Sequence, residues 1–383
     1  MCPFSPEETS RYQDFNETMS FYQNHNVSIK FGSDSEDKNP PQHISSLFTK
    51  TLQFRRLTLN PIRIGGPAEL ELLLGILSSS RDLLEELSLG LGTFAVSREE
   101  SSQLLRDYWT HKFPKMTRLS LSSQNQDQDG TDTFFTGILP VFPALQNLTV
   151  SGNLLPLLFS NKDSAKTMSS ITKLTLASSP IPLKPDELHP LLLLPTGQLS
   201  KLTLNSIQSP DGAMSDLYFL LSRQSATLTE LTLQIHHHFS GFLLFPSFPA
   251  LKKFSFSMQH GDVEIYFIKP GFSTATPGQQ VGLILAKNYY GGIDYGYHFP
   301  KLESFRCDAL GGTWSATCFK AWFPYDFRNP AYVCKTVKYF EFMEHDTKER
   351  LREGKIADKY TRLPRLFPNA SNEYVQLIKK CSP

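Results

Sequence analysis

The sequence predicts an α/β fold, a solenoid or horseshoe with a concave parallel β-sheet and helices on its convex side. Three observations predict it. A short pattern, apolar-x-x-apolar-x-apolar, recurs ten times along the 383 residues, its copies are mostly 23 to 32 residues apart, and helical patterns fill the intervals. A strand, a helix and another strand of this length require parallel pairing, with the helices on the outer side of the sheet.

The repeated pattern begins with FRRLTL at 54–59 and ends with VKYFEF at 337–342. In each copy the second apolar residue, here called the anchor, and the residue two positions later point to the same face of a strand. That apolar face needs burial, and stacked neighbours provide it in one continuous core. The anchors are Leu57, Leu87, Leu119, Leu148, Leu174, Leu202, Leu231, Phe254, Phe305 and Phe340.

Helices are expected between the strands. Residues 67–80 begin with proline at a first-turn position and carry leucines at helical spacing. Ser97 and Glu100 have the spacing of a capping box that opens a second helix. Residues 211–224 place Met214, Leu217, Tyr218 and Leu221 on one helical face.

A Phe-Pro pair precedes several strands, at 113–116, 142–145, 248–251, 299–302 and 367–370. Proline restricts the backbone at a turn, and its missing N–H is not needed before a strand begins. In the first four copies the proline stands five residues before an anchor. The fifth copy therefore predicts a last, imperfect strand around Val375 and Leu377.

The interval of 51 residues between Phe254 and Phe305 indicates either an insertion near 259–300 or one degenerate repeat. We expect three regions: a polar, partly disordered amino-terminal segment at 1–45, a repeat domain at 46–377 and a short tail at 378–383. Residues 343–363 carry charges of both signs and predict a solvated helix.

Composition excludes several classes of protein. The chain has 38 basic and 37 acidic side chains, a net charge of +1, so it has no global field that would attract nucleic acid. No apolar run reaches the length of a membrane span. The polar amino terminus does not resemble a signal peptide, and the five cysteines are scattered and never spaced as CxxC. We expect a reduced, monomeric protein of the cytoplasm or nucleus.

No motif of a nucleotide-binding, hydrolytic or zinc-dependent enzyme is present, so we expect no catalytic activity and no cofactor. Three consecutive histidines, His236, His237 and His238, could suggest a metal site. Successive side chains of an extended chain point in opposite directions, however, so we expect no metal there.

The repeats resemble the leucine-rich-repeat superfamily in its ribonuclease-inhibitor-like class, over about residues 52–377. The pattern Phe-Pro-x-Leu-x-x-Leu-x-Leu is similar to the repeats of F-box/LRR proteins, where Cys-Pro-x-Leu often stands in that place. This resemblance implies a protein-interaction module, the substrate-recognition part of a ubiquitin ligase that would bind a ligase adaptor through an F-box. Residues 1–45 show no F-box pattern.

Two explanations stay open: the F-box is missing through truncation or loss, or the protein never served a ubiquitin ligase. In the second case the resemblance implies a stand-alone scaffold or inhibitor that occludes a protein partner. The sequence does not identify that partner.

The residues on either side of the anchors are the candidate binding surface. Neighbouring strands are about 4.8 Å apart, so these residues form two ladders across the sheet. We expect an acidic or phosphorylated partner on the basic ladder; alternatively these residues form an ordinary solvated sheet face. The candidates are Arg56, Arg118, Lys173, Lys201 and Lys253 in the basic ladder, and Thr149, Thr175, Thr203, Thr232 and Ser255 in the hydroxyl ladder.

A second candidate is the tyrosine- and glycine-rich stretch within 259–300. Tyrosine offers rigid aromatic area on an adaptable backbone, which suits recognition. It equally suits a surface loop packed by its own rings. The residues concerned are Tyr289, Tyr290, Tyr295 and Tyr297.

Overall fold

The computed structural model describes residues 27–28, 54–108, 110–123, 129–160, 167–177, 185–207, 215–236, 241–258, 263–268, 290–309, 316–326, 328–344, 353 and 358–381. The chain divides into two compact units, Met1–Ile171 and Thr172–Pro383. Each is an α/β unit built on parallel strands, and each is described by itself.

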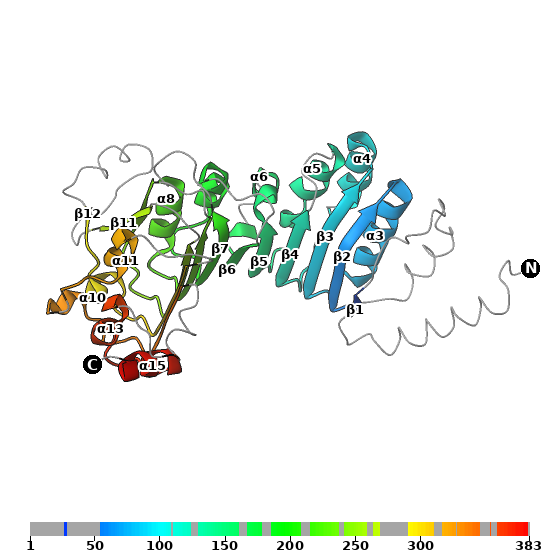
Figure 1. Ribbon diagram of the computed structural model, residues 1–383. Coiled ribbons are helices and arrows are strands. Elements are labelled where there is room, and N and C mark those ends of the chain that lie inside the picture. Colours follow the sequence, from blue (N-terminus) through cyan, green and yellow to red (C-terminus); the bar gives the residue numbers. More distant parts are fainter. Residues whose placement is uncertain are drawn as a thin grey trace, which may run out of the picture. The chain divides into compact units, whose positions relative to one another are not determined.

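Unit 1 contains parallel strands that follow one another in chain order, with a helix or 3-10 turn between the longer ones (Figure 1). The strands are β1 (Val27–Ser28), β2 (Arg56–Ile64), β3 (Glu86–Phe94), β4 (Arg118–Ser123) and β5 (Asn147–Ser151). The helices are α3 (Pro67–Ser80), α4 (Arg98–Tyr108), α5 (Asp129–Thr136), η2 (Leu139–Val141), η3 (Gly152–Leu154) and α6 (Leu155–Leu158).

Unit 2 contains a parallel sheet in the order β6, β7, β8, β10, β13, β14. These strands are β6 (Lys173–Ala177), β7 (Lys201–Ile207), β8 (Glu230–Ile235), β10 (Lys253–Met258), β13 (Ser304–Ala309) and β14 (Tyr339–Met343). The helices are η4 (Pro185–Leu193), α8 (Ser215–Gln224), α10 (Tyr295–His298), α11 (Ala316–Trp322), η5 (Pro330–Tyr332), α13 (Asp358–Thr361), α14 (Leu363–Leu366) and α15 (Glu373–Cys381).

A second sheet of unit 2 has the order β12, β11, β9. It consists of β9 (Gly241–Phe245), β11 (Val263–Ile268) and β12 (Tyr290–Gly291), with β11 parallel to β9 and antiparallel to β12. The described part of 259–300 before α10 therefore adds strands to this second sheet and none to the first.

The strand predictions are confirmed at all ten copies of the repeated pattern. Each of β2 to β8, β10, β13 and β14 begins at the residue directly before an anchor. Each anchor is at most 2% exposed. The alternation of apolar and polar residues thus selects the buried face of each strand, as the period of two requires.

The helices predicted within 67–80, from Ser97 onward and within 211–224 are confirmed where the structure describes them. Helix α3 spans the predicted range, Pro67–Ser80. The capping box at α4 is formed, since Glu100 N donates to Ser97 Oγ and Ser97 N donates to Glu100 Oε2, both at 3.3 Å. Helix α8 begins at Ser215, and Met214 lies outside the described residues.

The register between strands is fixed just before each strand begins. In unit 2, Thr172 O accepts from the backbone N–H groups of Ser200 and Lys201, at 2.8 and 3.2 Å. Ser200 O in turn accepts from the N–H groups of Thr229 and Glu230, at 2.8 and 3.1 Å. Because one carbonyl holds two successive N–H groups of the next repeat, corresponding residues of neighbouring strands are aligned.

The Phe-Pro pairs form turns whose phenylalanines enter the core. Leu145 N donates to Phe142 O at 3.2 Å, and Leu302 N donates to Phe299 O at 3.2 Å. Phe142 and Phe299 are at most 1% exposed. The Phe248 and Phe299 rings stack at 5.7 Å between centroids. The turn therefore repeats with the strand and adds a row of aromatic rings to the core.

The predicted last strand around Val375 and Leu377 is wrong, because these residues belong to helix α15. The turn before it does form, with Ala370 N donating to Phe367 O at 3.1 Å. After the turn, the side chain of Asn372 takes both hydrogen bonds that a strand would make with Phe340. The chain then continues as a helix that buries Val375 and Ile378.

The single solvated helix predicted over 343–363 is also not found where the segment is described. Met343 ends strand β14, and only Asp358–Thr361 is helical before α14 begins at Leu363. Residues 345–352 and 354–357 of this segment lie outside the described residues. The carboxylate of Glu344 is buried and accepts a hydrogen bond from Tyr360 Oη, so this end of the segment is packed.

Candidate interaction surface

The residues on either side of the anchors lie opposite the core and form one polar face in each unit. In unit 2, Lys173 is paired with Lys201 and Thr175 with Thr203. Thr232 is paired with both Thr203 and Ser255 in the same row. These side chains are half-buried or exposed, whereas the anchors between them are buried. The alignment of the two predicted ladders is therefore present within each unit, and their role in binding stays a prediction.

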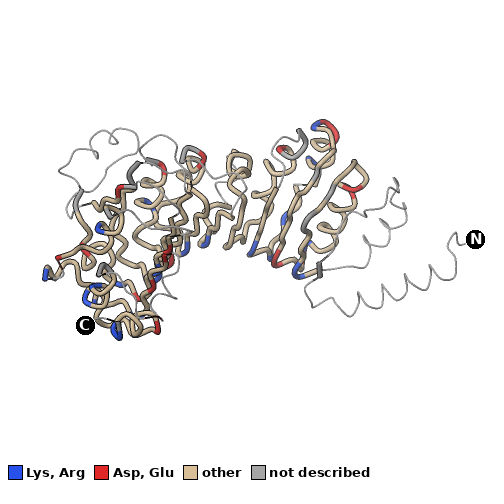
Figure 2. The backbone as a smooth tube through the Cα atoms, viewed as in Figure 1, with Lys and Arg blue, Asp and Glu red and all other residues tan. Residues whose placement is uncertain are grey.

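The basic ladder of unit 1 contains an acidic residue between its two arginines. The carboxylate of Glu86 lies 3.7 Å from Arg56 Nε and 3.4 Å from Arg118 Nη1. The hydroxyl row beside it places Thr149 opposite Ser120. Basic and acidic residues both occur at the starts of these strands (Figure 2). The polar face of unit 1 thus carries a cation–anion–cation triplet.

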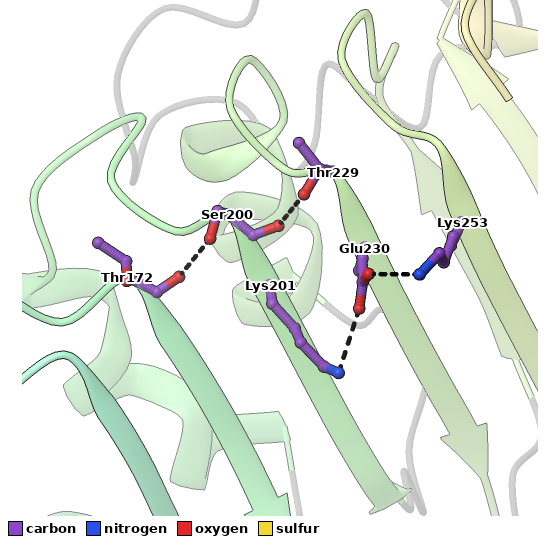
Figure 3. A network of polar contacts seen from close by, with 6 residues as sticks. All are labelled: Thr172, Ser200, Lys201, Thr229, Glu230 and Lys253. Atoms are coloured by element: carbon purple, nitrogen blue, oxygen red, sulfur yellow. Dashed lines mark hydrogen bonds and ion pairs between the residues drawn. The ribbon is translucent and has the colours of Figure 1, made fainter. Parts of the chain in front are cut away.

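The basic ladder of unit 2 has the same arrangement around Glu230. Lys201 Nζ lies 3.1 Å from Glu230 Oε2, and Lys253 Nζ lies 2.9 Å from Glu230 Oε1 (Figure 3). The hydrogen bonds from Lys253 and then Lys201 lower the pKa of Glu230, and the bond to Glu230 raises the pKa of Lys253. Lys173 has no ion pair among the described residues. The ladder is therefore a row of lysines interrupted by one carboxylate.

A mixed cluster occupies the polar face where β13 and β14 are paired. Arg306 lies between two carboxylates, with Nε 3.7 Å from Glu341 Oε2 and Nη2 3.8 Å from Asp308 Oδ2. Tyr339 Oη donates to Glu341 Oε2 at 2.8 Å, and Tyr339 is 41% exposed. Burial, aided by Glu341 and opposed by Arg306, raises the pKa of Asp308.

Sequence reasoning placed Arg306, Tyr339 and Glu341 beside anchors but did not select them as a site. A signal was available in the sequence, because a tyrosine ends the row before the anchors, after Lys253 and Ser304, and the hydroxyl row after them gives way to Arg306 and Glu341. Tyrosine and arginine are the residue types that most often dominate binding energy at protein interfaces.

The tyrosine-rich stretch divides between core and surface. Tyr295 is 1% exposed, and its hydroxyl donates to Trp322 O at 2.7 Å. Tyr297 is half-buried, and its backbone N–H donates to Asp294 Oδ1 at 3.1 Å. Tyr290 begins strand β12, and Tyr289 lies outside the described residues. Tyr295 is thus a core residue, and its proposed role in a recognition loop is withdrawn.

Metal ligands, reactive thiols and membrane-spanning helices are the remaining features to place in the part of the chain that the structure describes. No group of three or more His, Cys, Asp and Glu side chains there could hold a metal ion, and His237 and His238 lie outside it. The thiols of Cys307, Cys318 and Cys334 are buried, which raises their pKa. No described helix combines the length and apolar character needed to cross a bilayer.

Comparison with known proteins finds no family model that matches this chain and no curated protein with significant similarity to it.

Proposed function

We propose that this chain is a leucine-rich-repeat solenoid that binds a protein partner through the polar face of its sheet. The observation that carries the proposal is the register of the rows beside the anchors. In unit 2, Lys253 is paired with Ser304 and Ser304 with Tyr339, so side chains from consecutive repeats share one surface. A repeat array presents such a surface as a regular platform, which suits binding to another macromolecule.

Two physical arguments favour binding over catalysis. The polar face displays side chains suited to recognition: hydroxyls, lysines, an arginine and an exposed tyrosine. The thiols of Cys307, Cys318 and Cys334 are buried and their pKa is raised, so they are in their unreactive form at neutral pH.

Partner binding by the polar face is tested by placing bulky, uncharged side chains at its centre. The variant Thr203→Tyr/Thr232→Tyr adds two rings to the hydroxyl row, and Gln103→Tyr adds one to the exposed side of α4. A partner isolated with the wild-type protein and then purified should bind the α4 variant normally and the double variant at least tenfold more weakly. Equal binding to both variants would contradict the proposal.

The identity of the recovered partner distinguishes the two functions that the family resemblance implies. Recovery of a ubiquitin-ligase adaptor, together with dependence on the native amino-terminal region, supports substrate recognition within a ligase. A single stoichiometric partner without an adaptor supports a scaffold or an inhibitor.

A further inference from the structure

The charges on the polar face of unit 2 differ in how far they reach into solvent. The cations are the more exposed: the side chains of Lys253, Arg306 and Lys201 are 66%, 52% and 43% exposed. The carboxylates paired with these three cations are lower, with Glu230 at 33%, Asp308 at 26% and Glu341 at 9%. Glu303, whose charge also acts on Lys253, is 48% exposed and is paired with Lys338. An approaching partner therefore meets ammonium and guanidinium groups first.

Glu230 shows what kind of group this surface binds. Its carboxylate is held by two lysines of the neighbouring strands at 2.9 and 3.1 Å. Two lysines converging on one carboxylate are the contacts that an acidic side chain of a partner would also make. Glu230 is therefore an internal occupant that competes with any external carboxylate for the same two cations.

The spacing of the cations fits an extended polypeptide that crosses the strands. From β6 to β13 there are four strand intervals in the sheet order, about 19 Å at 4.8 Å each. An extended chain covers that distance in about seven residues, with every second side chain on the same side. Alternate acidic residues would then face Lys173, Lys201, Lys253 and Arg306 in succession.

Nucleic acid fits this surface less well. A phosphate backbone carries a charge at every nucleotide and binds best to continuous basic surfaces. Here Glu230 interrupts the lysine row and Asp308 and Glu341 flank Arg306, on a chain whose net charge is only +1. Alternating acidic and neutral residues avoid these carboxylates, whereas a phosphate at every position meets them.

We propose that the polar face of unit 2 binds an extended acidic polypeptide segment, rich in Asp or Glu, across strands β6 to β13, and that Glu230 limits its affinity by competing for Lys201 and Lys253. This inference rests on the proposed function and specifies the chemistry of its partner. It predicts that removing the charge of Glu230 strengthens binding, which no merely structural role of this residue would do.

The test uses the full chain and a fluorescein-labelled peptide of about ten residues that alternates Glu and Gly, read by fluorescence anisotropy at low salt. Glu230→Gln should bind this peptide about threefold more tightly than the wild type, and Lys201→Gln/Lys253→Gln about fivefold to tenfold more weakly. A matched control, Lys112→Gln/Lys115→Gln, removes the same charge from an exposed turn of unit 1 and should change the affinity less than twofold. Circular dichroism establishes that each variant is folded.

Several results would overturn the inference: weaker or unchanged binding by Glu230→Gln, equal losses in the two lysine pairs, or equal binding of a Gln-Gly peptide. Tighter binding of a phosphoserine-Gly peptide or of single-stranded oligothymidine than of the Glu-Gly peptide would also overturn it. Failure here and failure of the proposed function are separable. A protein partner that is lost with Thr203→Tyr/Thr232→Tyr but retained with Lys201→Gln/Lys253→Gln refutes the acidic segment and leaves the binding face intact.

Discussion

Both polar atoms of the Asn372 side chain are hydrogen bonded to the backbone of Phe340. Asn372 Nδ2 donates to Phe340 O at 2.9 Å, and Asn372 Oδ1 accepts from Phe340 N at 3.1 Å. Phe340 lies in β14, the last strand in the order of its sheet. One amide side chain thus replaces a neighbouring strand at a position where an edge would otherwise present unpaired groups.

We predict that Asn372→Ala destabilises the protein by about 1 to 3 kcal/mol, because it leaves a backbone donor and an acceptor without their partners. Urea unfolding measures the loss. Asn369→Ala is the control, since Asn369 makes a single exposed bond, from Nδ2 to Lys335 O at 2.6 Å. A loss no larger in Asn372→Ala than in Asn369→Ala would contradict this account of the edge.

The same variant should also associate with itself. An unprotected strand edge is a template for pairing with another chain, so sedimentation velocity should show concentration-dependent dimers of Asn372→Ala. The Asn369→Ala control should sediment as the wild type does at the same concentrations.

The repeated strands were predictable because local pattern and global fold agree in them. Leu174 and Leu202 must be buried, Lys173 and Lys201 must not, and a period of two satisfies both only in a strand. The last element was not predictable in this way. The Phe-Pro entry at Phe367 matches the earlier ones, but a helix follows it, and the side chain of Asn372 makes the hydrogen bonds to Phe340 that a further strand would make.

The candidate site was predictable in position and not in electrostatics. The pattern indicates that Lys201, Glu230 and Lys253 share a row. Whether they form ion pairs depends on which rotamer each lysine adopts toward the neighbouring strand that carries Glu230. The burial of Tyr295 could not be predicted from the sequence for a related reason. Tyrosine is compatible with both surface and core, and only the position of Trp322 O, which accepts its hydroxyl, selects the core.

Trp322 should be the most costly aromatic residue to truncate in unit 2. It is fully buried, and its ring lies 5.0 Å from Phe267 and 5.2 Å from Phe245 of the second sheet, and 5.4 Å from Phe254 of the first. We expect Trp322→Ala to lower the free energy of unfolding by about 3 to 5 kcal/mol. Equilibrium unfolding in urea tests this.

Trp322→Phe should cost clearly less than Trp322→Ala. It keeps an aromatic ring in the cluster and removes the indole N–H, which has no hydrogen-bond partner among the described residues. Leu193→Ala, at a side chain that is 62% exposed, should change stability by less than about 0.5 kcal/mol. A comparable loss in Leu193→Ala would indicate that burial does not set these costs.

The three buried thiols should be inert in the folded protein. Burial raises the pKa of Cys307, Cys318 and Cys334, and the thiolate is the reactive form. In a Cys2→Ser/Cys381→Ser background, a colorimetric thiol reagent at pH 8 should label none of them within minutes. Addition of urea should then expose all three, and fast labelling of the native protein would refute their burial.

His298 should make the stability of unit 2 depend on pH. The residue is 1% exposed, Nε2 lies 2.9 Å from Ile268 O, and Nδ1 lies 2.9 Å from Asp294 N and 2.8 Å from Asp294 O. Burial of the ring disfavours its charged form. Burial lowers the pKa of His298, and the carbonyls of Ile268 and Asp294 and the charge of Asp294 oppose that shift only in part.

The sign follows from which state binds the proton more readily. The unfolded chain protonates His298 near its ordinary pKa of about 6.5, and the folded protein does so only at a lower pH. The stabilisation is therefore complete above about pH 6.5 and is lost as the pH falls through the folded pKa. Urea unfolding between about pH 7.5 and 5 should show this decline, and His298→Asn should flatten it while lowering stability at neutral pH. His111→Gln, at an exposed histidine, should keep the wild-type profile, and an unchanged slope in His298→Asn would assign the decline to other groups.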